Sequence, residues 1–261
     1  ALDLSWRVAI GVVAVVGAAF AGYCLLRFRG VDDEITRPGL AERPDERPTL
    51  RSVPGRIRAL FRTLASSGGI LGLTVLAFLT SAAAWAIRTY TPSLLVRGYG
   101  LPEGTASALT SAMLVVGAGL ILAGGGLTDR VGAGPIVVGG YAALVVVAAL
   151  LATLSLPLAA VGIVLLLSGS ISFSRPARST LADRLSRRAD LGKNFALVTI
   201  GISLGGVVAP PVFGYLVDVA GLTVSFGLVS ALGVLSLALG LRIVRDASFA
   251  VPGSAAGADG D

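Results

Sequence analysis

Between Arg130 and Arg175 the chain contains no charged residue. A helix crosses the hydrocarbon core of a bilayer, roughly 30 Å thick, with about 20 apolar residues, so this run is too long for one crossing and long enough for two. Pro157 lies near the middle of the run, and proline begins a helix more readily than it continues one. The run therefore predicts two membrane-spanning helices with a polar turn at residues 155–157.

Long apolar segments of the same kind fill most of the chain. Of its 261 residues, 54% are hydrophobic and 14% are charged, and the hydrophobic residues run continuously instead of recurring at the period of a soluble helix. The sequence predicts an all-α membrane protein with seven transmembrane helices. The predicted segments are Val8–Leu26, Ser66–Val96, Thr105–Gly126, Gly134–Leu154, Leu156–Ser174, Phe195–Val217 and Thr223–Leu241.

The basic residues gather at alternate ends of these segments. Most of them follow the first, third, fifth and seventh segments, whereas the opposite ends have only Arg7, Arg88 and Arg97. Because cytoplasmic loops carry the excess of Lys and Arg, we expect a multi-pass plasma-membrane protein with its N-terminus outside and its C-terminus in the cytoplasm. This placement accounts for the net charge of +6 without a nucleic-acid partner.

Composition divides the chain into four parts. Residues 1–26 are predicted to form one helix, residues 27–65 a cytoplasmic loop, residues 66–245 a six-helix bundle, and residues 246–261 a disordered tail rich in Ala, Gly, Ser and Asp. The end of the loop, residues 56–64, has apolar residues at helical spacing between arginines. This pattern fits a basic helix on the anionic inner leaflet and equally a solvated linker.

Missing residue types exclude several chemistries. Cys24 is the only cysteine and there is no histidine, which excludes a disulfide framework, a metal site of Cys or His ligands, and an imidazole proton relay. No nucleophile, base or metal cluster lies in the apolar segments, so we expect neither an enzyme nor a cofactor. A retinal protein needs a lysine deep in its last helix, but Lys193 lies in a predicted loop. A seven-helix receptor or sensor that binds a ligand without transport is the remaining alternative.

One pattern, G-x-L-x-D-x-x-G, occurs twice, each time between two predicted helices. Its residues are Gly125, Leu127, Asp129 and Gly132 in the first copy, where Arg130 follows the aspartate, and Gly214, Leu216, Asp218 and Gly221 in the second. Structural repeats inside a membrane bundle are typical of secondary transporters. The pattern therefore favours a transporter over a receptor.

The first copy has two interpretations. Asp129 can accept hydrogen bonds from the exposed N–H groups of a helix N-terminus, and Arg130 can face a carboxylate or an anionic lipid, so that the pair forms a breakable latch. Alternatively, Asp129 caps the next helix and Arg130 follows the positive-inside rule. Gly125 and Gly132 are expected to let two helix ends approach closely.

Glycines and prolines inside the predicted helices indicate places where helices could slide or bend. Close helix contact is expected at Gly68-Gly69, Gly117/Gly119, Gly124–Gly126 and Gly201/Gly205. Pro210-Pro211 is expected to kink the sixth helix, which gives a bend that gating could use.

These residues resemble the major facilitator superfamily. The matching stretches are the Asp129 segment, Pro176-Ala177-Arg178 through Asp183, and Gly205-Gly206 through Pro210-Pro211 to Gly221. The resemblance implies two six-helix bundles joined by a long cytoplasmic loop, of which this chain has the sixth helix, the loop and the C-terminal bundle. It also implies a secondary transporter that moves a small solute by alternating access, as a drug or organic-ion efflux antiporter. The N-terminal half would be supplied by the same full-length chain or by another chain. The signature departs from the family at Ala133 and Gly134, where the family has basic residues.

Ionisable residues inside the apolar segments are the candidates for a substrate path. Arg88 lies in the second segment beside Trp85 and Tyr90, one turn before Pro92, where it could face a central cavity and attract an anionic or carboxylate-bearing substrate. Alternatively, Arg88 snorkels to the outer interface among aromatic residues. Arg175 is expected at the cytoplasmic mouth, either on the path or placed there by the positive-inside rule. No carboxylate lies deep in any predicted segment, so an acid for proton coupling is not expected here.

Overall fold

The computed structural model describes residues 6–28, 68–168, 170–186 and 191–249. The chain divides into two units, Ala1–Arg56 and Ile57–Asp261. All regular elements within the described ranges are helices, as the sequence predicts. The hypothesis of a basic surface helix falls outside the described residues, as do most of the predicted loop and the tail from residue 250.

The first unit has one described helix, α1, which spans Trp6–Phe28. It includes the predicted segment Val8–Leu26 and extends two residues beyond each end, so Arg27 belongs to its last turn. Apart from Arg7 in its first turn and Arg27, the helix carries no charged residue and its sequence shows no polar face. A helix without a polar face fits a bilayer better than water.

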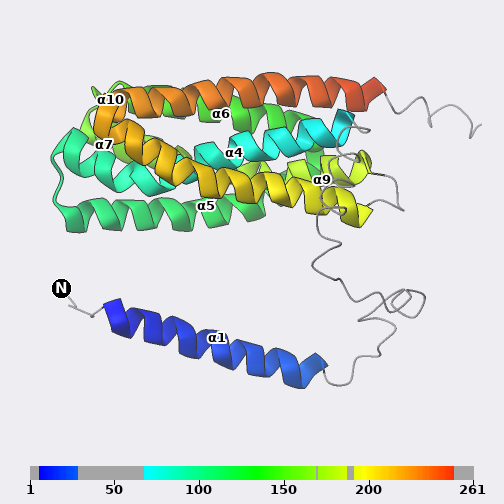
Figure 1. The fold of residues 1–261 in the computed structure, drawn as a ribbon, viewed down its shortest axis with the longest axis horizontal. Helices are drawn as coiled ribbons and strands as arrows, with labels where there is room; N and C mark the ends of the chain where they lie inside the picture. Colours follow the sequence, from blue (N-terminus) through cyan, green and yellow to red (C-terminus); the bar gives the residue numbers. More distant parts are fainter. Residues whose placement is uncertain (1–5, 29–67, 169, 187–190, 250–261) are drawn as a thin grey trace, which may run out of the picture. The chain divides into compact units, whose positions relative to one another are not determined.

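The second unit is a bundle of helices that lie side by side (Figure 1). Its first helix, α4, spans Gly68–Ser93 and continues as a π-helix over Leu94–Gly98, followed by α5 (Glu103–Val131) and α6 (Ala133–Ala152). The chain returns through α7 (Leu158–Ser168), α8 (Ser170–Phe173) and α9 (Arg175–Arg184). The last helix, α10 (Leu191–Phe249), runs along the bundle twice and turns at Gly221.

The seven predicted segments correspond to these helices. Five described helices are long and apolar enough to cross a membrane, and α10 holds two predicted segments because Gly221 interrupts it. The segment Leu156–Ser174 contains α7 and α8, and residue 169 between them lies outside the described ranges. The break predicted at residues 155–157 is confirmed, since α6 ends at Ala152 and α7 begins at Leu158.

Three predicted boundaries are wrong because helices extend beyond the apolar residues that predicted them. The first repeat copy belongs to the final turns of α5, down to Val131, instead of a loop. Lys193 lies in the first turn of α10 and not in a loop, and α10 includes residues 246–249 of the predicted tail. Once a helix has formed, adding a polar residue costs little free energy. Helices predicted from hydropathy alone are therefore shorter than the helices of the structure.

The two repeat copies end in the same backbone conformation. Gly132 has φ 87° and ψ 163°, and Gly221 has φ 83° and ψ 174°. A positive φ of this size is strained for a residue with a side chain, which explains the final glycine of each copy. The pattern therefore specifies one type of turn, used at both ends of the bundle.

Two expectations for the first copy are wrong. The N-terminus of α6 has no side-chain cap hydrogen bond, so Asp129 does not cap the next helix. A Cβ atom on Gly125 or Gly132 would meet nothing within 4 Å, so these glycines do not serve a close approach of helix ends. At Gly132 the backbone conformation itself requires the glycine.

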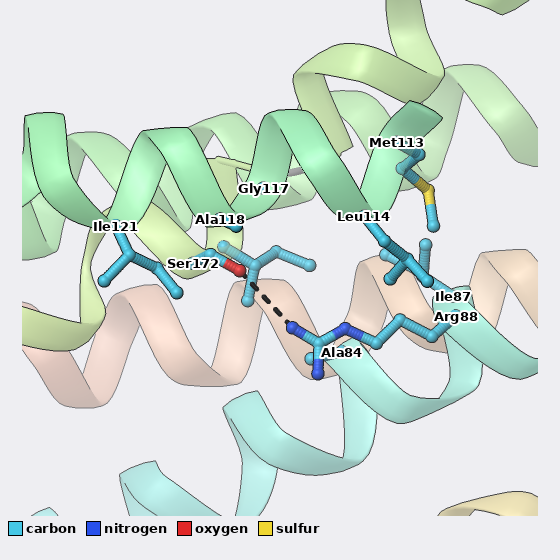
Figure 2. A pocket seen from close by; sticks show the side chains of 10 residues that line it. Ala84, Ile87, Arg88, Met113, Leu114, Gly117, Ala118, Ile121 and Ser172 are labelled. Atoms are coloured by element: carbon cyan, nitrogen blue, oxygen red, sulfur yellow. Dashed lines mark hydrogen bonds between the residues drawn. The ribbon is translucent and has the colours of Figure 1, made fainter. Parts of the chain in front are cut away.

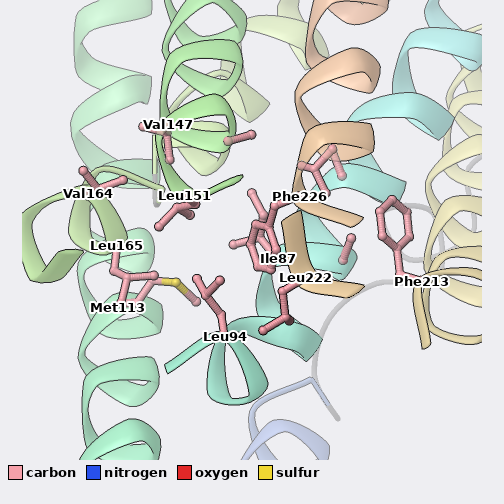
Figure 3. Close-up of a cluster of buried hydrophobic side chains, with 14 of the residues drawn as sticks. Ile87, Leu94, Met113, Val147, Leu151, Val164, Leu165, Phe213, Leu222 and Phe226 are labelled. Carbon is pink, nitrogen blue, oxygen red and sulfur yellow. The ribbon is translucent and has the colours of Figure 1, made fainter. Parts of the chain in front are cut away.

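Buried side chains form two clusters in the second unit. One cluster joins α4, α5, α6, α7 and α10, and Figure 3 shows Ile87, Met113, Leu151, Leu165 and Phe226 among its members. The other surrounds the fully buried Tyr141 and includes residues from the beginnings of α4, α6 and α10 and from α9. These clusters hold α4 in the centre of the bundle, with neighbours on several sides.

One side of α4 packs tightly against the first half of α10. Ser81 Oγ donates a hydrogen bond of 2.7 Å to the carbonyl of Ile202. A Cβ atom on Gly205 would lie 2.6 Å from the carbonyl oxygen of Phe78, and one on Gly201 would also collide with the α4 backbone. The two glycines are four residues apart, and this spacing lets two membrane helices approach backbone to backbone.

The expected glycine contacts are confirmed only in part. They are present at Gly201 and Gly205, and at Gly124, where a Cβ atom would collide with the backbone of Phe173. At Gly69 a Cβ atom would make only an ordinary contact with Leu185, and at Gly119 and Gly126 it would meet nothing within 4 Å of the described chain. The expectation is therefore wrong for these positions, because sequence shows a glycine but not which face of the helix it occupies.

Candidate functional site

Two adjoining cavities border α4. The larger, of about 160 Å³, is lined by α4, α5 and α8, and the smaller, of about 50 Å³, by α4, α8, α9 and α10. They share Ala84 and Arg88 of α4 and Ile171 and Ser172 of α8. The shared residues make the cavities two lobes of one site.

Arg88 lies where the two lobes meet. Its side chain is half-buried, and its Nη2 donates a hydrogen bond of 3.4 Å to Ser172 Oγ (Figure 2). The guanidinium is therefore held between α4 and α8 on the cavity wall. This geometry does not fit the alternative in which Arg88 snorkels to the interface near Arg97.

Two further guanidinium groups line the smaller lobe, from Arg175 and Arg178 of α9. Arg178 is only 7% exposed, and its Nη1 donates a hydrogen bond of 2.8 Å to Thr80 Oγ1. Thr80 in turn donates to the carbonyl of Leu76 at 2.7 Å. The side chain of Arg178 thus connects α9 to the polar side of α4.

The surroundings of Arg178 disfavour its charge. Burial lowers the pKa of its guanidinium, a hydrogen bond and the charge interaction with Tyr141 act in the opposite direction, and the nearby charge of Arg175 lowers it further. Arg175 also repels Arg88. The charge of Arg175 therefore acts on both of the other guanidiniums of the site.

No carboxylate balances this charge within the described part of the second unit. Its acidic residues are all exposed and line neither lobe; they are Glu103, Asp129, Asp183, Asp218 and Asp246. Desolvated cations without counterions raise the free energy of the folded protein. An anion that enters the cavity lowers it, so the site is suited to attract negative charge.

The larger lobe is mostly apolar. Its wall on the α5 side consists of Met113, Leu114 and Ile121, and the small residues Gly117 and Ala118 leave the space between them (Figure 2). An apolar lobe beside a cationic lobe fits a ligand that has an apolar body and a negative group.

The other predicted path residues have different positions. Trp85 lines the smaller lobe, together with Arg88 and Arg175. Tyr90 lines neither lobe, and its hydroxyl donates a hydrogen bond to the carbonyl of Pro210 in α10. A Cβ atom on Gly214 would lie 2.6 Å from that hydroxyl, so the first glycine of the second repeat copy makes room for Tyr90.

The predicted gating residues lie away from the cavity. Leu127, Asp129 and Arg130 are exposed at the end of α5. In the second copy, Asp218 Oδ1 lies 3.5 Å from Arg97 Nη1 in an exposed ion pair.

The backbone torsions of α10 are helical at Pro210 and Pro211. Pro210 and Pro211 lie inside α10, and the residue with non-helical torsions is Gly221.

Sequence reasoning missed Arg178, Thr80 and Ser172 as site residues. Arg88 and Ser172 are 84 positions apart, and no sequence pattern shows that α4 and α8 meet there. One signal was available: Arg175 and Arg178 are three residues apart, so a helix places both on one face. The same spacing in a loop would have carried no such information.

The family model of the Major Facilitator Superfamily matches residues 1–186, more than half of the chain. The chain belongs to this superfamily. No curated protein matches its sequence. As a major facilitator protein it is a multi-pass membrane transporter, and the family is generally not enzymatic. Among the described residues, no group of three His, Cys, Asp or Glu side chains could hold a metal ion. The cationic cavity beside Arg88 is the candidate substrate site of this transporter.

Proposed function

We propose that this major facilitator chain is the C-terminal portion of an antiporter that exports a small organic ion by alternating access. One observation carries the proposal: the guanidinium of Arg88 lies on a cavity inside the bundle although α4 is otherwise uncharged up to Arg97. A charge within a membrane-spanning helix is costly and by default marks the path of an ion or substrate.

The size of the cavity supports a shared site. The larger lobe has about 160 Å³, whereas a pocket for a drug-sized ligand has roughly 300–1,000 Å³. Sites of secondary transporters lie near the midplane, between two structural repeats. We propose that a second, N-terminal bundle provides the opposite wall, and that α1 is the last helix of that bundle.

The proposed orientation follows the basic residues. Arg130 lies near the end of α5, and Arg242 and Arg245 lie near the end of α10, at the proposed cytoplasmic face. Single cysteines at Glu42 and Ser186 should label only from the cytoplasm, and one at Gly100 only from outside. External labelling at Ser186 would reverse the proposed topology.

We assign a latch to the first repeat copy. With the capping interpretation excluded by the uncapped N-terminus of α6, the exposed Asp129 and Arg130 are free to contact a moving surface. Asp129→Asn should slow transport while changing substrate affinity by only a few fold, because the variant alters a conformational equilibrium and not the site. Unchanged transport at normal expression would contradict the latch.

Substrate counterflow tests the proposed function. Proteoliposomes with the full-length protein are loaded with an unlabelled organic anion, organic cation or sugar, and uptake of the same labelled compound is followed. At least one compound should accumulate, and Arg88→Gln should lower its initial rate by about tenfold or more, as expected for the loss of a hydrogen-bonded charge. Arg242→Gln, which removes the charge of an exposed residue that lines neither lobe, is the matched control. Absence of counterflow with every compound would contradict transport.

A further inference from the structure

We infer that the cavity binds an amphipathic organic monocarboxylate, with its carboxylate at Arg88, Ser172 and Arg175 and its apolar body against α5. This inference deepens the proposed function and rests on it insofar as the ligand is the transported substrate. Binding itself can be measured without transport.

The charges of the site favour an anion. Arg88, Arg175 and Arg178 line one lobe, and the acidic residues of the described second unit are all exposed and outside it. An organic cation would add to the repulsion between Arg88 and Arg175, whereas a carboxylate would relieve it. The ligand is therefore expected to carry a negative charge.

Unused hydrogen-bond donors favour a carboxylate. A guanidinium has five N–H donors, and within the described residues Arg88 uses its guanidinium only for the 3.4 Å bond to Ser172. The guanidinium of Arg175 is exposed and donates to no described residue. Arg178, by contrast, is already hydrogen-bonded to Thr80. It therefore acts on the ligand mainly through its positive charge and less through direct contact. Two arginines with free donors can hold the two oxygens of a carboxylate.

The larger lobe favours an apolar body on the same ligand. Met113, Leu114 and Ile121 line it, with Ala118 between them (Figure 2), and none of these side chains has a hydrogen-bond donor for a sugar or a second anionic group. The volume of about 160 Å³ is below that of drug-sized sites, so a small aromatic or branched aliphatic body fits best. Benzoate has both required parts and serves as the probe.

The experiment measures binding to the purified full-length protein in nanodiscs. Titration calorimetry is performed with benzoate, with benzamide as its neutral isostere, with benzylamine as its cationic counterpart, and with inorganic phosphate. We expect benzoate to bind at least about tenfold tighter than each of the others, the size of one charge-assisted contact. Equal affinity for benzoate and benzamide would overturn the anion site, and equal affinity for phosphate would overturn the apolar lobe.

Variants locate the binding site. Arg88→Gln should weaken benzoate binding by about tenfold or more and Arg88→Lys by less, because lysine retains the charge but not the two-pronged geometry. Arg242→Gln should bind as the unchanged protein does. Benzoate binding that is insensitive to Arg88→Gln would place the site elsewhere and overturn the inference.

A second variant covers the case in which Arg88→Gln does not fold. Ala118 is exposed and lines the larger lobe, so Ala118→Leu fills that lobe without disturbing a packed core. It should weaken binding of benzoate more than binding of acetate, which needs only the cationic lobe. An equal effect on both ligands would contradict the assignment of the lobes. Tight binding with this pattern in a protein that shows no counterflow would uphold the site and refute only transport.

Discussion

The two sides of α4 differ in how they contact the rest of the bundle. Toward α10, glycine lets the two backbones meet, so that Gly205 lies against the Phe78 backbone, and Ser81 bonds directly to the Ile202 carbonyl at 2.7 Å. Toward α5, α8 and α9, the helix borders two cavity lobes, and the bonds across them are those of 3.4 Å from Arg88 to Ser172 and 2.8 Å from Arg178 to Thr80. One side is packed backbone to backbone, and the other is connected by long arginine side chains that line a cavity.

This difference assigns separate roles to the two sides. The glycine contact lets α4 and the first half of α10 move as one body, because backbone-to-backbone packing tolerates little change in separation. The cavity side can change with its contents, since a bound anion replaces a repulsive arrangement of arginines. The predictions below test the packed side and the cavity side in turn.

Gly205→Ala should give the largest change in stability. The added Cβ atom would lie 2.6 Å from the Phe78 carbonyl oxygen, and overpacking of this kind costs about 1–3 kcal/mol. Gly119→Ala is the control, because its Cβ atom meets nothing within 4 Å and alanine in a helix is favoured over glycine by about 0.5–1 kcal/mol. Unfolding in SDS, followed by helical content, should therefore show opposite signs for the two variants. Equal stability would contradict the packed contact.

Arg178→Met should raise stability by about 1 kcal/mol, because an apolar side chain replaces a desolvated charge that has no carboxylate partner among the described residues. Burial lowers the pKa of Arg178, so its charged form is less favourable in the folded protein than in water. Thr80 keeps its bond to Leu76, so the substitution leaves no orphaned hydroxyl there. The same variant should weaken benzoate binding. A clear fall in stability in the SDS assay would show that Arg178 is a structural contact and not a charge held for a ligand.

Tyr90→Phe should have the smallest effect, a loss of about 0.6 kcal/mol, the average for a hydrogen bond between membrane helices. The variant removes the bond to the Pro210 carbonyl and keeps the aromatic ring beside Gly214. Benzoate affinity should not change, because Tyr90 lines neither lobe. A loss of affinity measured by calorimetry would return Tyr90 to the substrate path that the sequence suggested.

The transmembrane segments could be predicted from sequence because hydrocarbon thickness fixes the length of an apolar run. The turns at Gly132 and Gly221 were also visible, since a repeated glycine marks a repeated backbone requirement. The end of α5 was predicted too early, before Asp129, and the start of α10 too late, after Lys193, because polar residues continue a helix into the interface. The π-helix over Leu94–Gly98 had no sequence signal beyond the preceding Pro92.

The candidate site could be predicted only one residue at a time. Arg88, Trp85 and Arg175 stood out as polar or aromatic residues in apolar surroundings, but their meeting depends on how α4 packs against α8 and α9. Tyr90 looked equivalent to Trp85 in sequence, yet Trp85 lines the smaller lobe and Tyr90 lines neither. Long-range packing decides such questions, and a single sequence does not contain it.

Accessibility of a single cysteine at Ala118 reports whether the cavity beside Arg88 lies on the transport path. Ala118→Cys is placed in a Cys24→Ser background of the full-length protein in vesicles, and its reaction with a membrane-impermeant thiol reagent is timed. We expect benzoate to slow this labelling, and we expect the protection to be lost when Arg88→Gln is added. Labelling at the same rate with and without benzoate, in a protein that transports it, would show that the cavity is not on the transport path.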